Sequence, residues 1–437
     1  MSEYFDSVKL KLDSLINEMA ENVTEYVGNP GKDFTRKRKL PFADMVKLII
    51  TMGGNSICKE LLDASGYDEN TATSSAFVQR REKILPKAFE KLFRDFTGEY
   101  SGRKTYKGYR LYANDGSDLH IPTNPDDPET HTSSNLNGSG HNLLHLNSLY
   151  DLLNRLYVDA LVQTDKHKNE HSALLEMMKR TDCGNDSVIV ICDKNYESYN
   201  AIGNFEQKGW KFLIRVKDID SNGILSRSKL PESEEFDVQL KFSLTKSANK
   251  KIKANPDVYR SIPHSTLFDF LDKNNKFYDM SFRAVRIKLE NGTFETVITN
   301  LPQDEFPPSE LKNLYALRWG IETSFRELKY AVGLLNFHSE KRANIEQEIF
   351  AKIIMHNFSE ILITAVVVEK SDTKHTYQVN FIVAINICKT FLRNFSAVTS
   401  DTVFLLIRKN TLPIRPNRKY KRKPRFKKAV SFIYRVA

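Results

Sequence analysis

Cysteine is scarce in this chain, with only four among 437 residues. No two of them form a C-x-x-C pair, so the sequence carries neither the ligand spacing of a structural zinc site nor the framework of a disulfide-rich secreted domain. Each lies in or beside an apolar run, which predicts buried thiols. The four are Cys58, Cys183, Cys192 and Cys388.

Long apolar runs are also missing. The longest, such as residues 361–368, are far shorter than the stretch of about 20 residues that a membrane-spanning helix requires. No basic segment followed by an apolar core opens the chain, as a secretory signal would. We therefore expect a cytoplasmic protein without a membrane partner.

Acidic residues are outnumbered, because 65 Lys and Arg stand against 55 Asp and Glu and give a net charge of +10. This balance favours a polyanionic partner. It is most extreme in the last 30 residues, where acids are absent and prolines recur, so we expect an extended or disordered segment that either binds phosphates without sequence preference or only aids solubility. The basic residues with the strongest expectation of phosphate contact are Arg418, Lys419, Lys421 and Arg422.

One polar stripe stands out between residues 311 and 333. Tyr315, Arg318, Glu322 and Lys329 are spaced three, four and seven apart, which on one continuous helix places all four within an arc of roughly 60°. An apolar stripe runs beside them and can dock that helix on a core. Cations, a phenol and a carboxylate on one rigid face suit a metal-assisted phosphodiester site, although charged helix faces are often merely solvated.

The order Y-x2-R-x3-E-x6-K resembles the signature of the insertion-sequence-4 family of DDE transposases, whose members carry two upstream aspartates. Asp115 follows an alternating strand and begins the Asp-Gly-Ser of the first motif, and Asp193 ends a continuous apolar strand. Family members continue after the second aspartate with Arg-Gly-Tyr or Arg-Gly-Phe, whereas this chain has Lys194, Asn195 and Tyr196. The residues after the second aspartate therefore differ from the family motif, but the aspartate itself, Asp193, is present.

This resemblance implies a DNA transposase in which Asp115, Asp193 and Glu322 hold two Mg2+ ions, replaceable by Mn2+. Such an enzyme cuts and joins strands, with a hairpin intermediate, on double-stranded transposon ends and target DNA. Tyr315, Arg318 and Lys329 would contact phosphates, and a homodimer would form on paired ends. The resemblance also implies that the protein acts in the cytoplasm of a bacterium, in association with the nucleoid.

Other interpretations remain open at this point. Asp118, Asp151, Asp159 and Glu327 are rival carboxylates, of which Asp118 lies on the opposite strand face from Asp115 and Glu327 lies off the polar stripe. Asp151 and Asp159 are not excluded by geometry. A nuclease with the same acids, or a non-catalytic DNA-binding relative, would also fit the motifs.

The order of elements predicts the architecture. Residues 1–105 lack strand alternation and are expected to form a separate helical DNA-binding domain, either a helix-turn-helix-like reader or a plain bundle, with Arg36, Lys37, Arg38, Arg80 and Arg81 as candidate DNA contacts. From residue 106 the order is three strands, helix, strand, helix, strand, as in the α/β ribonuclease H-like fold expected of the family. The ranges expected to follow are 106–218 for the first part of this core, 219–303 for a β-rich insertion, 304–370 for the second part, and 371–437 for C-terminal helices and the basic tail.

Overall fold

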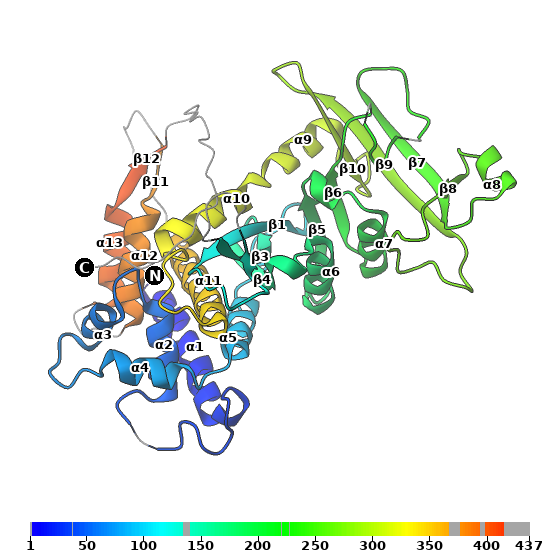
Figure 1. Ribbon diagram of the computed structural model, residues 1–437. Coiled ribbons are helices and arrows are strands. Elements are labelled where there is room, and N and C mark those ends of the chain that lie inside the picture. The colour runs from blue at the N-terminus through cyan, green and yellow to red at the C-terminus, as the bar shows by residue number, and fades with distance from the viewer. Residues whose placement is uncertain are drawn as a thin grey trace.

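A long mixed sheet connects a helical end of the molecule to a strand-rich end (Figure 1). The computed structural model describes residues 2–36, 38–133, 140–219, 221–226, 228–366, 376–393 and 398–414. Among these residues, no helix is long and apolar enough to cross a membrane.

The central strands form the order β4-β3-β1-β5-β6. β1 pairs antiparallel with β3 and parallel with β5, while β4 lies antiparallel to β3. This pairing of the first and fourth long strands is consistent with the expected ribonuclease H-like core. The elements are β1 (Tyr109–Ile121), β2 (His131–Thr132), β3 (His141–Asp151), β4 (Leu156–Thr164), η2 (Asp165–His167), α6 (Glu170–Arg180), β5 (Ser187–Cys192), η3 (Lys194–Tyr196), α7 (Tyr199–Lys208) and β6 (Lys211–Arg215).

The strand-rich part extends this same sheet. β10 pairs antiparallel with β6, and β9, β7 and β8 follow outward. The strands that alternation predicts in this part of the chain are therefore present, and backbone hydrogen bonds join them to the central strands. The elements are β7 (Phe236–Thr245), α8 (Lys250–Ala254), β8 (Tyr259–Ser261), β9 (Tyr278–Lys288) and β10 (Phe294–Thr299).

The N-terminal helices do not have a core of their own, contrary to the separate domain expected for residues 1–105. Phe5 of α1 and Phe93 of α5 belong to one apolar cluster with Ile353 of α11 and Ile385 of α12. The expected boundary therefore divides a single hydrophobic core. The helices and strands at this end are α1 (Ser2–Glu21), η1 (Val23–Glu25), α2 (Phe42–Thr51), α3 (Ile57–Ser65), α4 (Ser74–Arg81), α5 (Pro86–Gly98), α11 (Arg342–Thr364), β11 (Tyr377–Val379), α12 (Phe381–Leu392), α13 (Ser400–Lys409) and β12 (Thr411–Pro413).

The segment with the polar stripe is helical throughout, but its hydrogen-bond pattern divides it into three parts. It consists of α9 (Pro308–Ala316), α10 (Trp319–Arg326) and a π-helical turn η4 (Glu327–Val332). The two halves bury different faces, because Leu311 packs in the cluster under β9 and β10 while Ile321 packs in the large helical core. Between α9 and α10, Leu317 and Arg318 keep right-handed helical backbone angles, so the chain stays helical while its hydrogen-bond pattern changes.

Candidate active site

Two of the predicted acids lie at the same edge of the sheet. β1 and β5 run parallel, with Asn114 opposite Cys192, so Asp115 and Asp193 are the next residues on neighbouring strands. Neighbouring strands lie about 4.8 Å apart. Asp193 ends its strand, and its side chain accepts a hydrogen bond of 2.8 Å from the Asn195 backbone N–H, which caps the short helix η3.

Glu322 reaches this edge from α10 through Arg318. The Arg318 Nη2 donates to Glu322 Oε1 at 2.6 Å, and its Nη1 lies 3.6 Å from Asp115 Oδ2. Arg318 is only 7% exposed, and its Nε has no hydrogen-bond partner among the described residues. The guanidinium thus bridges two of the three acids and retains an unused donor.

The electrostatics of the first aspartate reflect the proximity of the other acids. Burial, with repulsion from Asp193 and Glu322, raises the pKa of Asp115 to about 6, against the opposing effects of the Gly116 N–H and Arg318. Three carboxylates that repel one another favour a bound cation. Their ligand atoms do not meet the 4.8 Å mutual spacing of a closed metal cluster, and Arg318 lies between Asp115 and Glu322.

The remaining residues of the polar stripe support this edge. The Lys329 Nζ donates to Ser117 Oγ at 2.6 Å and to the Asp118 carbonyl at 2.9 Å, which ties η4 to β1. Tyr315 is 6% exposed, and its ring centroid lies 5.8 Å from the Arg318 guanidinium carbon. The structure therefore brings Asp115, Arg318, Glu322 and Lys329 together, although the segment is divided into α9, α10 and η4.

Residues 106–358 match the family model described as Transposase DDE domain. The chain belongs to this family. A solved structure described as the piggyBac transposase synaptic complex with hairpin DNA is similar over 91% of this chain and 85% of that chain, with 10% sequence identity and a TM-score of 0.45. No curated protein matches the sequence.

The rival carboxylates of this transposase each have another role. Asp151 is buried and accepts hydrogen bonds from the Leu153 and Asn154 backbone, so it holds the turn between β3 and β4. Asp159 is 2% exposed and pairs with both Nε and Nη2 of Arg180. The hydrogen bonds of both acids therefore go to partners other than Asp115, Asp193 and Glu322.

Sequence reasoning missed a buried charge cluster beside the first aspartate. His145 on β3 is 2% exposed; its Nδ1 lies 2.7 Å from Asp118 Oδ1 and its Nε2 lies 3.1 Å from Glu170 Oε1. Although burial opposes it, these two carboxylates raise the pKa of His145. The Cβ of any larger residue at Gly116 would collide with Nε2 of this ring. The only sequence signal was three histidines near the first strands.

Two arginines expected to contact DNA are inside the molecule. Arg81 is 1% exposed, and its Nη1 forms a 2.8 Å ion pair with Glu348 of α11. Arg80 is 9% exposed and lies over the Phe34 ring at 4.0 Å. The burial of Arg81 against α11 contradicts its expected DNA contact, whereas the expectation for Arg80, which lines a surface pocket with Arg38 and Lys39, stays a prediction.

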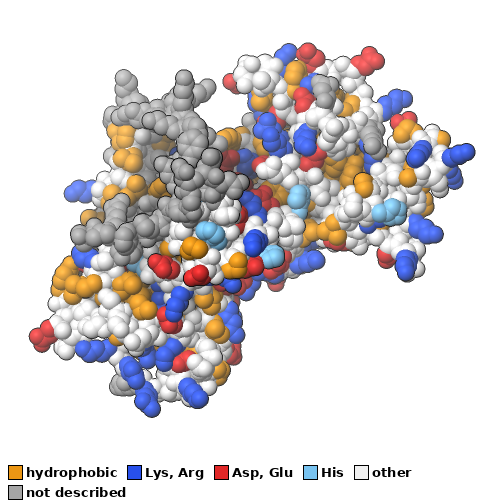
Figure 2. Space-filling view, in the orientation of Figure 1, with side chains coloured by type: hydrophobic (Ala, Val, Ile, Leu, Met, Phe, Trp, Pro, Cys, Tyr) orange, Lys and Arg blue, Asp and Glu red, His pale blue; other side chains and the backbone are white. Residues whose placement is uncertain are grey.

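Other predicted contacts remain on the surface or lie outside the described residues. Arg36 and Arg38 are exposed. Lys37, Arg418, Lys419, Lys421 and Arg422 lie outside the described residues. In Figure 2, Lys and Arg side chains appear on both the helical and the strand-rich ends of this face.

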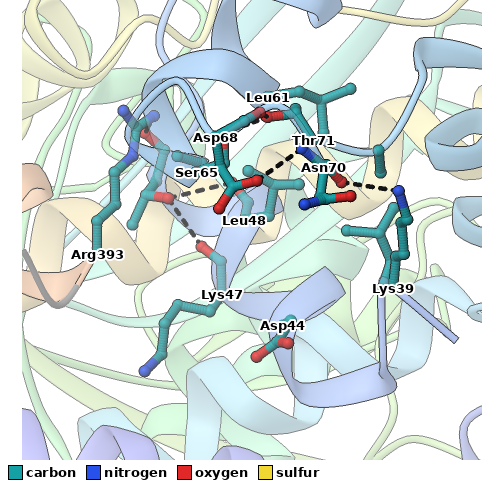
Figure 3. A pocket seen from close by; sticks show the side chains of 14 residues that line it. Lys39, Asp44, Lys47, Leu48, Leu61, Ser65, Asp68, Asn70, Thr71 and Arg393 are labelled. Atoms are coloured by element: carbon teal, nitrogen blue, oxygen red, sulfur yellow. Dashed lines mark hydrogen bonds between the residues drawn. The ribbon is translucent and has the colours of Figure 1, made fainter. Parts of the chain in front are cut away.

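A pocket of about 460 Å³ adjoins the exposed basic segment (Figure 3). The Lys39 Nζ donates to the Asn70 carbonyl at 3.0 Å at one end of it. At other points Lys47 pairs with Asp13 at 2.6 Å, and Arg393 pairs with Glu60 at 2.9 Å. These cations already have partners, so the pocket is mixed in charge and does not form a cationic groove.

Proposed function

We propose that this chain is a DNA transposase of the insertion-sequence-4 type, which binds transposon ends and cuts and joins DNA at Asp115, Asp193 and Glu322. The observation that carries the proposal is the meeting of these acids at one edge of the sheet, with Arg318 between two of them. Membership of the DDE transposase family supports the same chemistry. We further propose a hairpin intermediate and a homodimer on paired double-stranded ends.

The acid cluster suits divalent cations. It offers only carboxylate oxygens, the donors that Mg2+ prefers and that Mn2+ also accepts. Burial is the main cause of the raised pKa of Asp115, and repulsion from Asp193 and Glu322 adds to it, so a bound cation would stabilise the charged form. We propose two ions per site; when bound, they would activate an attacking water or 3'-hydroxyl and stabilise the leaving oxygen.

The basic side chains would place the substrate. Arg318 has five donors and no acceptor, so it cannot ligate a metal, but its planar fork can grip a phosphate. Its unpartnered Nε supports this role. Lys329 and Tyr315 would support the phosphates beside the scissile bond, while Arg36, Lys37, Arg38 and the basic tail would contact the DNA backbone farther away.

Substitution of the acids tests the proposal. We expect Asp115→Asn, Asp193→Asn and Glu322→Gln each to abolish cleavage of DNA that carries the terminal repeats flanking the gene, because each change removes a metal ligand. End binding, measured by gel shift, and circular dichroism should be retained. Asp304→Asn, at an exposed acid outside the polar stripe, is the matched control and should cut normally.

The products separate this proposal from its alternatives. Joined strands in the presence of target DNA identify a transposase, whereas cleavage without joining identifies a nuclease of the same fold. Binding without cleavage by the unaltered chain would indicate a non-catalytic relative. If any one of the three acid variants still cut DNA, its assignment would be withdrawn.

A further inference from the structure

A second group of potential metal ligands lies on η4, which follows α10, and on α11. Glu327 begins the π-helical turn η4, and His356 and Glu360 are one turn apart on α11. One ligand atom from each lies within 4.8 Å of the others. Spacing of four residues places two ligands on one helix face, as in helical metal motifs, and π-helical turns are frequent at functional sites.

His356 is the buried member of this group that lies among aromatic rings. It is fully buried, and neither ring nitrogen has a hydrogen-bond partner among the described residues. Its Nε2 lies 4.0 Å from Glu327 Oε2, and the Tyr157 and Phe381 rings enclose it at 5.0 and 5.7 Å between centroids. Burial lowers the pKa of His356 to about 3, so the ring is neutral and keeps a lone pair for a ligand. A buried polar group without a partner destabilises the folded state.

Both carboxylates pair with Arg155. This residue, in the turn between β3 and β4, donates from Nε and Nη2 to the two Glu360 oxygens at 2.9 and 2.7 Å and lies 3.3 Å from Glu327. Glu360 is fully buried. Burial and the repulsion from Glu360 raise the pKa of Glu327 to about 7. Arg155 therefore pairs closely with Glu360 and more weakly with Glu327.

We propose that Glu327, His356 and Glu360 form a second, non-catalytic metal site that takes a divalent transition-metal ion such as Zn2+ or Mn2+. One imidazole nitrogen and two carboxylate oxygens are a common ligand set for these ions. Ligand atoms around a tetrahedral Zn2+ lie about 3.4 Å apart, so the side chains need to approach by roughly 1 Å. The ion would tie η4, which follows the Glu322 helix, to α11.

Arg155 is the competitor for this site. Its side chain is 43% exposed, so it can leave the carboxylates for solvent when an ion arrives. A pocket of about 790 Å³, lined by Arg155, Glu327 and Glu360 among others, provides the entry path. Removal of this guanidinium should therefore strengthen metal binding, whereas removal of a ligand should weaken it.

The test uses the full chain with Asp115→Asn and Glu322→Gln, which weakens the proposed catalytic site so that it does not contribute. Zn2+ and Mn2+ are titrated in competition with a chromogenic chelator. We expect one Zn2+ per chain, binding at least about tenfold weaker with Glu327→Gln, and tighter binding with Arg155→Ala. Glu340→Gln, at an exposed acid before α11, is the control and should change nothing.

A second measurement guards against misfolding of a variant. Zn2+ should raise the thermal unfolding temperature of the parent chain and of the Arg155→Ala chain, but not that of the Glu327→Gln chain, each compared with itself in chelator. Failure of both ions to bind, or binding that Glu327→Gln leaves unchanged, would overturn the site. This outcome is independent of DNA cleavage, so it does not bear on the proposed function.

Discussion

At the scale of single residues, Arg318 links two acids of the proposed active site before any substrate binds. Its contacts at 2.6 Å with Glu322 and 3.6 Å with Asp115 show that one guanidinium serves two acids. A phosphate entering the site would compete for the same donors. Arg318 is therefore a substrate-positioning residue in our proposal, and Lys329, which donates to β1, supports the segment that follows Glu322.

We expect Arg318→Ala to reduce cleavage by about two orders of magnitude or more, because a misplaced phosphodiester reacts slowly. Lys329→Ala should have a smaller effect, since the Lys329 ammonium donates to Ser117 and to the Asp118 carbonyl on β1. Single-turnover cleavage at saturating DNA measures both. A larger loss with Lys329→Ala, or normal cleavage by both variants, would contradict the role given to the polar stripe.

The buried pair of Arg81 and Glu348 predicts a pH-dependent contribution to stability. Although burial opposes it, Arg81 and His338 hold the pKa of Glu348 at about 2, below its ordinary value of 4.5. A lowered acid pKa stabilises the folded state above pH 4.5, and this contribution is lost as the pH falls toward 2. We expect Glu348→Gln to lower the free energy of unfolding by about 3–5 kcal/mol at pH 7, because it leaves a buried Arg81 charge.

Urea unfolding followed by circular dichroism at pH 7, 5 and 3.5 measures this effect. The difference between parent and variant should be constant between pH 7 and 5 and smaller at pH 3.5. Glu340→Gln serves as the exposed control. A difference that does not change with pH would show that Glu348 titrates as an ordinary glutamate.

At the scale of elements, β1 packs so tightly beside β3 and α6 that only glycine fits next to Asp115. The Cβ of an alanine at position 116 would collide with the His145 Nε2 and lie 3.2 Å from Glu170 Oε1. His145 cannot move easily, because it is held between Asp118 and Glu170. The position of the first catalytic acid therefore depends on a histidine of the neighbouring strand.

We expect Gly116→Ala to lower the free energy of unfolding by about 1–3 kcal/mol through overpacking. The same substitution should cost less in a His145→Ala chain, where the collision is absent. A double-mutant cycle by urea unfolding measures this coupling. Strict additivity of the two changes would contradict the close approach of the two strands.

At the scale of the whole molecule, the two ends of the chain build one core around α11. Asn357 of this helix donates to Thr97 of α5 at 2.8 Å and to the Tyr157 carbonyl of β4 at 2.8 Å. The central helix therefore joins the N-terminal helices to one face of the sheet. The basic tail begins just after β12, which pairs with β11.

Truncation after Ile414 tests the basic tail without disturbing β12. We expect weaker binding to any DNA by a similar factor, and a salt dependence whose slope falls by about 0.9 for each phosphate that the tail no longer neutralises. Binding measured between about 50 and 200 mM salt gives the slope. A cut at Lys409 would remove β12 as well and would be a poor test. An unchanged slope would show that the tail does not bind DNA.

Local patterns in the sequence determined much of this protein. Alternation and apolar runs predicted β1, β3, β4, β5 and β6 within a few residues, because the side-chain period of a half-buried or buried strand is read directly from neighbouring residues. The fold that the family resemblance implies then predicted that Asp115 and Asp193 meet at one edge with Glu322. The spacing of the polar stripe predicted that Arg318 and Glu322 share one helix face.

Only the tertiary structure decided those features that depend on residues far apart in the sequence. The change of hydrogen-bond pattern before α10 is not visible locally, and it lies where the segment passes from the cluster of Leu311 to that of Ile321. Arg81 is buried against Glu348, which lies 267 positions away in the sequence. No local pattern distinguishes such an arginine from a DNA contact. The grouping of Glu327 with His356 and Glu360 has the same origin: periodicity reports which face a residue occupies, and only packing decides what lies opposite that face.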